Sequence, residues 1–203
     1  MREALIVWGG WSGHEPEEGA SIVRDMLTAE GFKVYVENTT EAFADPSIAD
    51  MSLIVPIYTM SKIEKEELAN LTKAVEGGVG LAGYHGGMCD AFREAVDYQF
   101  MTGGQWVAHP GNATASYTVR IGPISSPITA GLRDFAVTSE QSYMPVDPGV
   151  TVLAHTLVPP GPGSGDPYSP DAPAVGGPGA PSPTGAGNGY ADCKCAGVYR
   201  CAG

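Results

Sequence analysis

Three short apolar runs, each ending in a glycine-rich or polar loop, constrain the fold of this chain most strongly. They occupy residues 4–7, 53–57 and 79–84. A continuous apolar run of about four to eight residues is typical of a strand buried on both faces, as in a parallel sheet. Stretches with apolar residues at helical spacing separate these runs. The alternation predicts an α/β protein with a largely parallel sheet.

The boundaries of the intervening elements follow from capping and breaking residues. Pro16 and the acidic residues after it suit the first turn of a helix, which Gly31 would end. Ser61 and Glu64 have the spacing of a capping box for a second helix, which Gly77 would end. The pattern also predicts a helix over 90–100 and strands over 32–36, 116–121, 135–138 and 150–155.

The last 46 residues differ in composition from the rest of the chain. Residues 158–203 hold 9 of the 17 prolines and 11 of the 28 glycines, and they contain no Trp, Phe, Ile or Met. Packed domains rarely carry so much Gly and Pro. We therefore expect one globular α/β domain over residues 1–157. Residues 158–203 would be a disordered tail or the product of a frameshift.

Charge and cysteine usage exclude several classes of partner. The chain has 11 basic and 23 acidic residues, a formal charge of −12, which argues against binding to nucleic acid or to an anionic membrane surface. Its apolar runs are too short for a signal-peptide core or a membrane span. Only Cys89 of the four cysteines lies before residue 158. We expect a cytoplasmic protein in a reducing compartment.

Three glycine-rich loops each contain one histidine: His14, His85 and His109. The carboxyl ends of parallel strands meet at one edge of a sheet, so we expect His14 and His85 at the same rim. The three rings could bind zinc, with Glu15 or Glu140 as a carboxylate partner. The alternative is that His14 and His109 only hydrogen-bond loop backbone.

His85 stands in a Gly-x-His-Gly-Gly turn after a buried strand, which has the shape of a nucleophile elbow. Imidazole at that position suits a general base or a metal ligand better than a nucleophile. Glu140 would be a general acid or base, or else a solvated strand end. Cys89 is a candidate nucleophile, although a buried free cysteine is the commoner case.

Aromatic and amide side chains accompany the histidines in these loops. Flat aromatic faces beside hydrogen-bonding groups commonly bind sugar rings. For each tryptophan taken alone, packing in the core or at its rim is the alternative. The candidates for sugar binding are Trp8, Trp11, Tyr84, Gln105 and Trp106.

Several of these segments, in this order, resemble the ThuA-like (trehalose utilisation) family over nearly all of residues 4–157. The segments that carry the resemblance are residues 7–16, 83–87, 98–101, 103–111, 127–132, 139–144 and 152–154. The resemblance implies a flavodoxin-like three-layer sandwich similar to class I glutamine amidotransferases, without the amidotransferase cysteine. It also implies a bacterial protein of trehalose or disaccharide breakdown, acting on a 3-keto sugar beside a sugar dehydrogenase, and a bound zinc.

By position, the resemblance carries a functional role to His14, Glu15, His85, Gln105, His109 and Glu140. Of these, His85, Glu140 and Glu15 are the candidate catalytic residues. The tail departs from the family, so we expect the C-terminal strands to be missing, and their loss could leave this chain inactive. The leading expectation is a sugar-processing enzyme whose partner is a small sugar, with self-association into a homo-oligomer left open. The alternatives are a zinc-dependent hydrolase of another small substrate and a non-catalytic sugar-binding or regulatory subunit.

Overall fold

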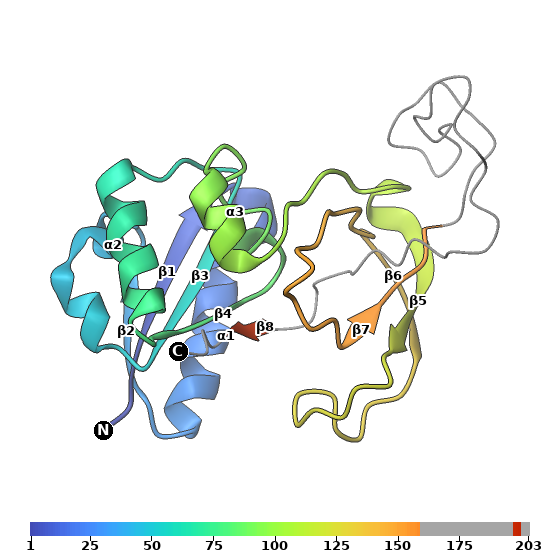
Figure 1. Ribbon diagram of the computed structural model, residues 1–203, viewed down its shortest axis with the longest axis horizontal. Helices are drawn as coiled ribbons and strands as arrows, with labels where there is room; N and C mark the ends of the chain where they lie inside the picture. The colour runs from blue at the N-terminus through green and yellow to red at the C-terminus, as the bar shows by residue number, and fades with distance from the viewer. Residues whose placement is uncertain (159–196, 200–203) are drawn as a thin grey trace. The chain divides into compact units, whose positions relative to one another are not determined.

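A computed structural model of the chain describes residues 1–158 and the backbone of residues 197–199 (Figure 1). The described residues form two compact units, residues 1–105 with 197–199 and residues 106–158. Apart from residues 197–199, the tail lies outside the described residues. The prediction that the tail is disordered, and its three cysteines, therefore concern residues that the structure does not describe. The domain boundary at residue 157 stays a prediction.

The first unit contains a five-stranded sheet whose order is β2-β1-β3-β4-β8. The first four of these strands are parallel, and β8 runs antiparallel to β4. All three apolar runs become adjacent central strands, as the pattern predicts. The strands are β1 (Glu3–Gly10), β2 (Lys33–Glu37), β3 (Leu53–Thr59), β4 (Gly80–Gly83) and β8 (Gly197–Tyr199).

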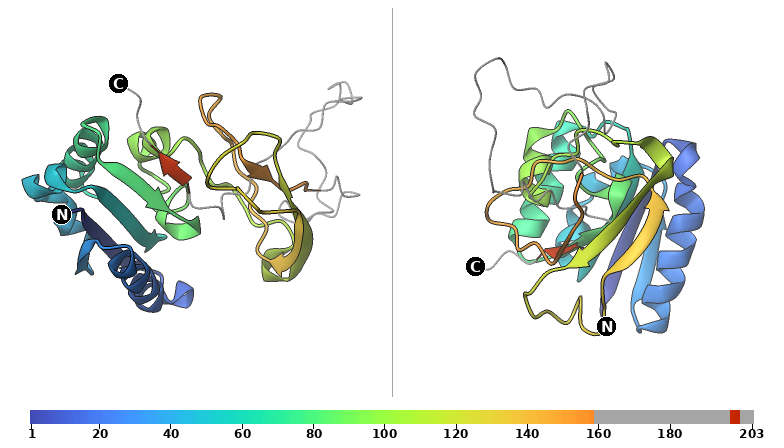
Figure 2. Two further views of the ribbon diagram at one scale, coloured as in Figure 1. Left: turned by 90° about the horizontal axis from the view of Figure 1, so that it is seen from below. Right: turned by 90° about the vertical axis from the view of Figure 1, so that its right-hand side faces the viewer.

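Helices cover both faces of this sheet. α1 (Pro16–Ala29) lies on one face, and α2 (Lys65–Glu76) lies on the other with α3 (Val96–Thr102) (Figure 2). The unit is therefore a flavodoxin-like three-layer sandwich. Among the described residues, no helix is long and apolar enough to cross a membrane.

The sheet is apolar on both faces because each face must meet a helix layer. Ile6 and Val55 pack with Ala20 of α1 in one buried cluster. Their sequence neighbours Leu5 and Ile54 point to the opposite face, because side chains alternate along a strand, and they are also buried. This two-sided burial explains why the strand sequences are continuous apolar runs rather than alternating ones.

The cap of α2 differs from the predicted one. The backbone N–H of Glu64 donates to the Glu67 carboxylate at 2.9 Å, so the capping box lies one turn later than Ser61 and Glu64. The backbone N–H of Ser61 instead donates to the carbonyl of Ala91 at 3.3 Å. A tertiary contact thus takes Ser61 out of the helix start.

The predicted helix over 90–100 is wrong in its first half. Residues 91–95 are turns and loop, and α3 begins at Val96 after an extended Ala95. The reason is burial. Phe92 packs edge-on against Tyr98 with ring centroids 4.9 Å apart, and both side chains are at most 2% exposed. A turn before α3 allows both rings to reach the core.

The second unit contains a three-stranded antiparallel sheet of order β6-β5-β7. Two of its strands match the predicted ones, but the strand predicted over 150–155 shrinks to two residues. The strands are β5 (Ala115–Ile121), β6 (Phe135–Ser139) and β7 (Ala154–His155). The 3₁₀ helices within the described residues are Ser12–His14, Thr40–Ala44, Pro46–Asp50, His85–Gly87 and Asn112–Thr114.

Candidate functional site

The loops after β1 and β4 bring His14 and His85 into direct contact. The two Nε2 atoms are 3.4 Å apart, and the ring centroids are 4.7 Å apart. Both side chains are partly buried. Strands β1 and β4 flank β3, so their carboxyl ends open on one edge of the sheet. Parallel topology therefore assembles this pair from positions 71 residues apart.

The turn after β4 is tight and holds His85 in a rare backbone conformation. His85 has a φ of 39°, which side chains other than glycine seldom adopt. A Cβ at Gly86 would overlap the side chain of Thr59, and one at Gly87 would overlap the carbonyl of Pro56. Glycine is thus required directly after His85 because the turn lies against β3. The observed strain is typical of functional turns.

His14 is held from two sides. Its Nδ1 is 2.9 Å from Oγ1 of Thr59, the last residue of β3, which is 4% exposed. The ring of Trp11 stands edge-on to the imidazole with centroids 4.8 Å apart. Trp11 is itself 52% exposed, so an aromatic surface in solvent adjoins His14, the first member of the pair.

The geometry of the pair suits a shared metal ion. Two histidine nitrogens bound tetrahedrally to zinc at about 2.0–2.1 Å lie about 3.3–3.4 Å apart. The observed separation of 3.4 Å between the Nε2 atoms of His14 and His85 matches that value, and it is long for a direct hydrogen bond. The Thr59 hydroxyl at the other nitrogen of His14 resembles the outer partners that orient metal-binding imidazoles.

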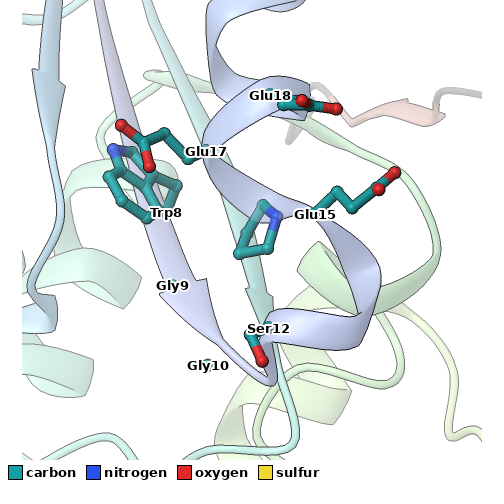
Figure 3. Close-up of a pocket in the computed structure, with 8 residues that line it drawn as sticks. Trp8, Gly9, Gly10, Ser12, Glu15, Glu17 and Glu18 are labelled. Atoms are coloured by element: carbon teal, nitrogen blue, oxygen red, sulfur yellow. The ribbon is translucent and has the colours of Figure 1, made fainter.

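A shallow pocket of about 310 Å³ lies where β1 leads into α1 (Figure 3). Its lining includes two predicted site residues, Trp8 and Glu15, but neither histidine. Figure 3 shows the Glu17 carboxylate reaching toward the Trp8 indole, whereas Glu15 points away from that ring. Trp8 also packs against the α1 side of the core, so it serves both the core and the pocket.

Tyr84 and Gln105 are both exposed residues of the first unit, and they lie in different segments of it. The Tyr84 hydroxyl lies close to Gly19, where a Cβ would approach it to 2.6 Å. Partial burial raises the pKa of Tyr84 above its usual value, so the phenol stays protonated. Gln105 is the last residue of the first unit before the chain enters the second.

The second unit forms its own cluster around His109. The Nε2 of His109 is 3.7 Å from a carboxylate oxygen of Glu140, and its Nδ1 is 3.3 Å from the carbonyl of Gln141. The ring centroids of Trp106 and His109 are 5.0 Å apart. Because a carbonyl only accepts, Nδ1 of His109 is the donor in that hydrogen bond. Nε2 then meets the carboxylate, as an ion pair when the ring is protonated.

The candidate residues are thus divided between the units: His14, His85 and Trp11 in the first, His109, Glu140 and Trp106 in the second. The predicted zinc site of three histidines stays a prediction.

Burial argues against Cys89 as a nucleophile. The residue is 7% exposed, and burial raises the pKa of its thiol to about 11. Nucleophilic cysteines instead have lowered pKa values in electropositive, accessible surroundings. Cys89 is a neutral buried thiol at physiological pH.

Sequence reasoning missed Thr59 and Asp90. Asp90 is 2% exposed, and its Oδ1 accepts from Arg93 at 2.5 Å. Its Oδ2 is buried and has no hydrogen-bond partner among the residues that the structure describes. A carboxylate oxygen of Asp90 lies within 4.8 Å of a ring nitrogen of His85. The only sequence signal for Thr59 was its place two residues after the strand predicted over 53–57. The position of that strand beside both loops depends on the fold.

The sheet order, the two helix layers and the polar loops at the strand ends define an α/β protein of the flavodoxin-like class. The family model of ThuA, described as trehalose utilisation, matches residues 3–175. The chain therefore belongs to the ThuA family, which gives it a role in sugar utilisation.

Solved structures share the fold at low sequence identity. A ThuA-like protein from Bacteroides uniformis superposes with a TM-score of 0.65 and 17% identity, covering 77% of this chain and 68% of that one. A ThuA-like protein from Parabacteroides merdae gives a TM-score of 0.55 and 15% identity, covering 76% and 68%. No curated protein matches the sequence significantly.

Proposed function

We propose that this chain is a sugar-processing enzyme that acts on a disaccharide such as trehalose or on its 3-keto derivative. One observation carries the proposal: the contacting imidazoles of His14 and His85 stand beside the exposed indole of Trp11. An aromatic face can stack on a sugar ring while imidazole nitrogens exchange protons with hydroxyl or carbonyl groups.

In this proposal His85 is the general base. His14 adjoins it through Nε2 and is held by Thr59, so it can stabilise the proton that His85 takes up. Trp11 and Trp8 would contact the sugar, and Glu15 would accept hydrogen bonds from its hydroxyls.

For the second unit we propose that Glu140 is a general acid or base, oriented by His109 at 3.7 Å, and that Trp106 offers a further aromatic surface. Oxidation to the keto sugar would be a separate reaction of a sugar dehydrogenase in the bacterial cytoplasm.

A zinc ion at this pair is the alternative to base catalysis by His85, because an Nε2 bound to zinc has no lone pair left to accept a proton. His14 and His85 are the residues that would hold the ion. The match between their Nε2 separation and tetrahedral zinc geometry supports this choice. When bound, zinc would act as a Lewis acid toward a sugar oxygen. His109 was predicted from sequence as a further ligand and is tested as such below.

Turnover of trehalose and of 3-keto-trehalose by the wild type and by His85→Ala tests the proposal. We expect a product with at least one of the two sugars and a loss of about 10²–10⁴-fold in the variant, the usual contribution of a general base. His155→Ala in β7 is the matched control, because His155 is a histidine outside the candidate residues. Turnover unchanged in His85→Ala would overturn the role of His85.

Metal content measured on untagged protein tests the cofactor. We expect about one zinc per chain in the wild type and in His155→Ala, and less in His14→Ala and His85→Ala. His109→Ala shows whether the third histidine contributes. Full zinc content in His85→Ala would exclude the pair as the metal site.

Two other functions remain distinct outcomes of these measurements. Zinc-dependent turnover of a small ester or amide, with none of either sugar, would indicate a zinc-dependent hydrolase of another substrate. Saturable sugar binding with no product in the presence or absence of zinc would indicate a non-catalytic sugar-binding or regulatory subunit.

A further inference from the structure

Thr59 contacts both of the loops that carry the histidine pair. Its carbonyl accepts the backbone N–H of Trp11 at 3.0 Å, and its hydroxyl lies 2.9 Å from Nδ1 of His14. On the other side its side chain fills the space that a Cβ at Gly86 would need, next to His85. Thr59 is therefore packed between the two histidine loops at the end of β3.

This packing fixes the position of the hydroxyl. Thr59 is 4% exposed, so bulk water does not compete for its hydrogen bond to His14. The backbone of Thr59 pairs with Gly10 in the β1–β3 register, which holds it from a second direction. A hydrogen-bond partner held this firmly controls how the imidazole is oriented and protonated.

The proton arrangement follows from the two contacts of His14. A neutral imidazole carries one N–H, at either Nδ1 or Nε2. The Thr59 hydroxyl can accept from Nδ1–H or donate to an unprotonated Nδ1. Only when Nδ1–H donates to Thr59 does the Nε2 lone pair of His14 face Nε2 of His85, 3.4 Å away. That arrangement suits both a hydrogen bond from His85 and ligation of a metal, whereas an Nε2–H on His14 would block ligation.

We propose that Thr59 is a positioning residue that selects the Nδ1–H tautomer of His14 and thereby directs its Nε2 lone pair toward His85. The proposal deepens the proposed function, because it assigns the residue that prepares the histidine pair. The choice of tautomer rests on the proposed zinc site, which needs an unprotonated Nε2 on His14, whereas the tautomer itself is measured without zinc or sugar.

The variants Thr59→Val and Thr59→Ser test this role. Valine keeps the shape of threonine and removes the hydroxyl, whereas serine keeps the hydroxyl. Thr28→Val is the matched control, because Thr28 is an exposed threonine of α1 whose hydroxyl bonds the backbone carbonyl of Arg24. Backbone amide spectra and urea unfolding show which variants keep the fold.

The readout is the tautomer of His14 in metal-free full-length protein, from the ¹⁵N shifts of its ring in two-bond ¹H–¹⁵N spectra at a pH where the ring is neutral. We expect the Nδ1–H form in the wild type, in Thr59→Ser and in Thr28→Val. In Thr59→Val the balance should shift toward Nε2–H. A purely structural role for Thr59 would not change the tautomer in a folded variant.

Two results would overturn the proposal: an Nε2–H tautomer of His14 in the wild type, or an unchanged tautomer in folded Thr59→Val. The wild-type spectrum decides the first even if Thr59→Val does not fold. Zinc titration then separates this proposal from the proposed function. If this proposal and the proposed function are both correct, Thr59→Val binds zinc about 10- to 100-fold more weakly than Thr59→Ser. If the wild type has the Nδ1–H tautomer but binds neither zinc nor sugar, the result contradicts the proposed function and not the role of Thr59.

Discussion

At the scale of residues, the site depends on side chains whose surroundings set their chemistry. His14 and Cys89 are both candidates by residue type, but only His14 is part of a solvent-accessible loop beside an exposed aromatic ring. Cys89 lies in the core, where burial keeps its thiol neutral. Residue type thus suggests a role, and the local environment decides whether the residue can perform it.

The reactivity of Cys89 measures this environment. The protein for this test keeps Cys89 and has the other three cysteines changed to serine. A thiol of pKa about 11 is ionised on the order of 300-fold less than a free cysteine at pH 7.5. The pKa is raised, so the reactive thiolate increases with pH. We expect labelling of native protein by a maleimide to accelerate about tenfold per pH unit between pH 7 and 9. Labelling of the folded protein at the rate of a free cysteine would contradict the assignment.

Gly86 is expected to tolerate no side chain. In Gly86→Ala the new Cβ overlaps Thr59, so the turn must shift; overpacking of this kind costs about 1–3 kcal/mol in the free energy of unfolding. The shift should also change the ring resonances of His14 and His85. Gly78→Ala is the control, because Gly78 has a φ of +105° and no atom within 4 Å of its Cβ position. Gly78→Ala should lower stability through backbone strain and leave both histidine resonances in place.

At the scale of elements, helix starts and turns show where tertiary contacts override local signals. Ser61 and Glu64 have the spacing of a capping box, yet the N–H of Ser61 bonds Ala91 and the box forms between Glu64 and Glu67. Likewise, the residues before α3 have helical character, but the burial of Phe92 requires a turn there. The same contacts place the segment after His85 against Ser61 and α3.

Two alanine variants distinguish the observed cap from the predicted one. Glu67→Ala removes the carboxylate that accepts from the N–H of Glu64, and we expect a loss of about 1 kcal/mol in the free energy of unfolding. Ser61→Ala should change stability by less than about 0.5 kcal/mol. Urea unfolding of both proteins measures the difference. A larger effect at Ser61 would favour the box expected from sequence.

At the scale of the whole molecule, the chain returns to its first unit after the second. Strand β8 pairs antiparallel with β4, in the register Leu81↔Tyr199 and Gly83↔Gly197. β4 leads directly into the turn that holds His85. A contact that spans more than 100 residues therefore supports one of the two histidine loops.

Removal of residues 197–203 tests this support. Without β8, the β4 backbone loses its partner on that edge, so we expect faster amide hydrogen exchange in residues 80–83. Exchange in β2, at the opposite edge of the sheet, should be unchanged and is the internal control. Equal protection of β4 amides with and without residues 197–203 would show that β8 does not stabilise the sheet in solution.

The sequence by itself determined the layered α/β class, the central strands and the loops that carry the histidines. It did so because continuous apolar runs, helical spacing and glycine-rich loops are local patterns with direct physical causes. The tertiary structure alone decided that His14 meets His85, that Thr59 lies between their loops, and that His109 pairs with Glu140. Those contacts depend on which strands become neighbours and in what register, and these properties arise from packing over distances that no local pattern encodes.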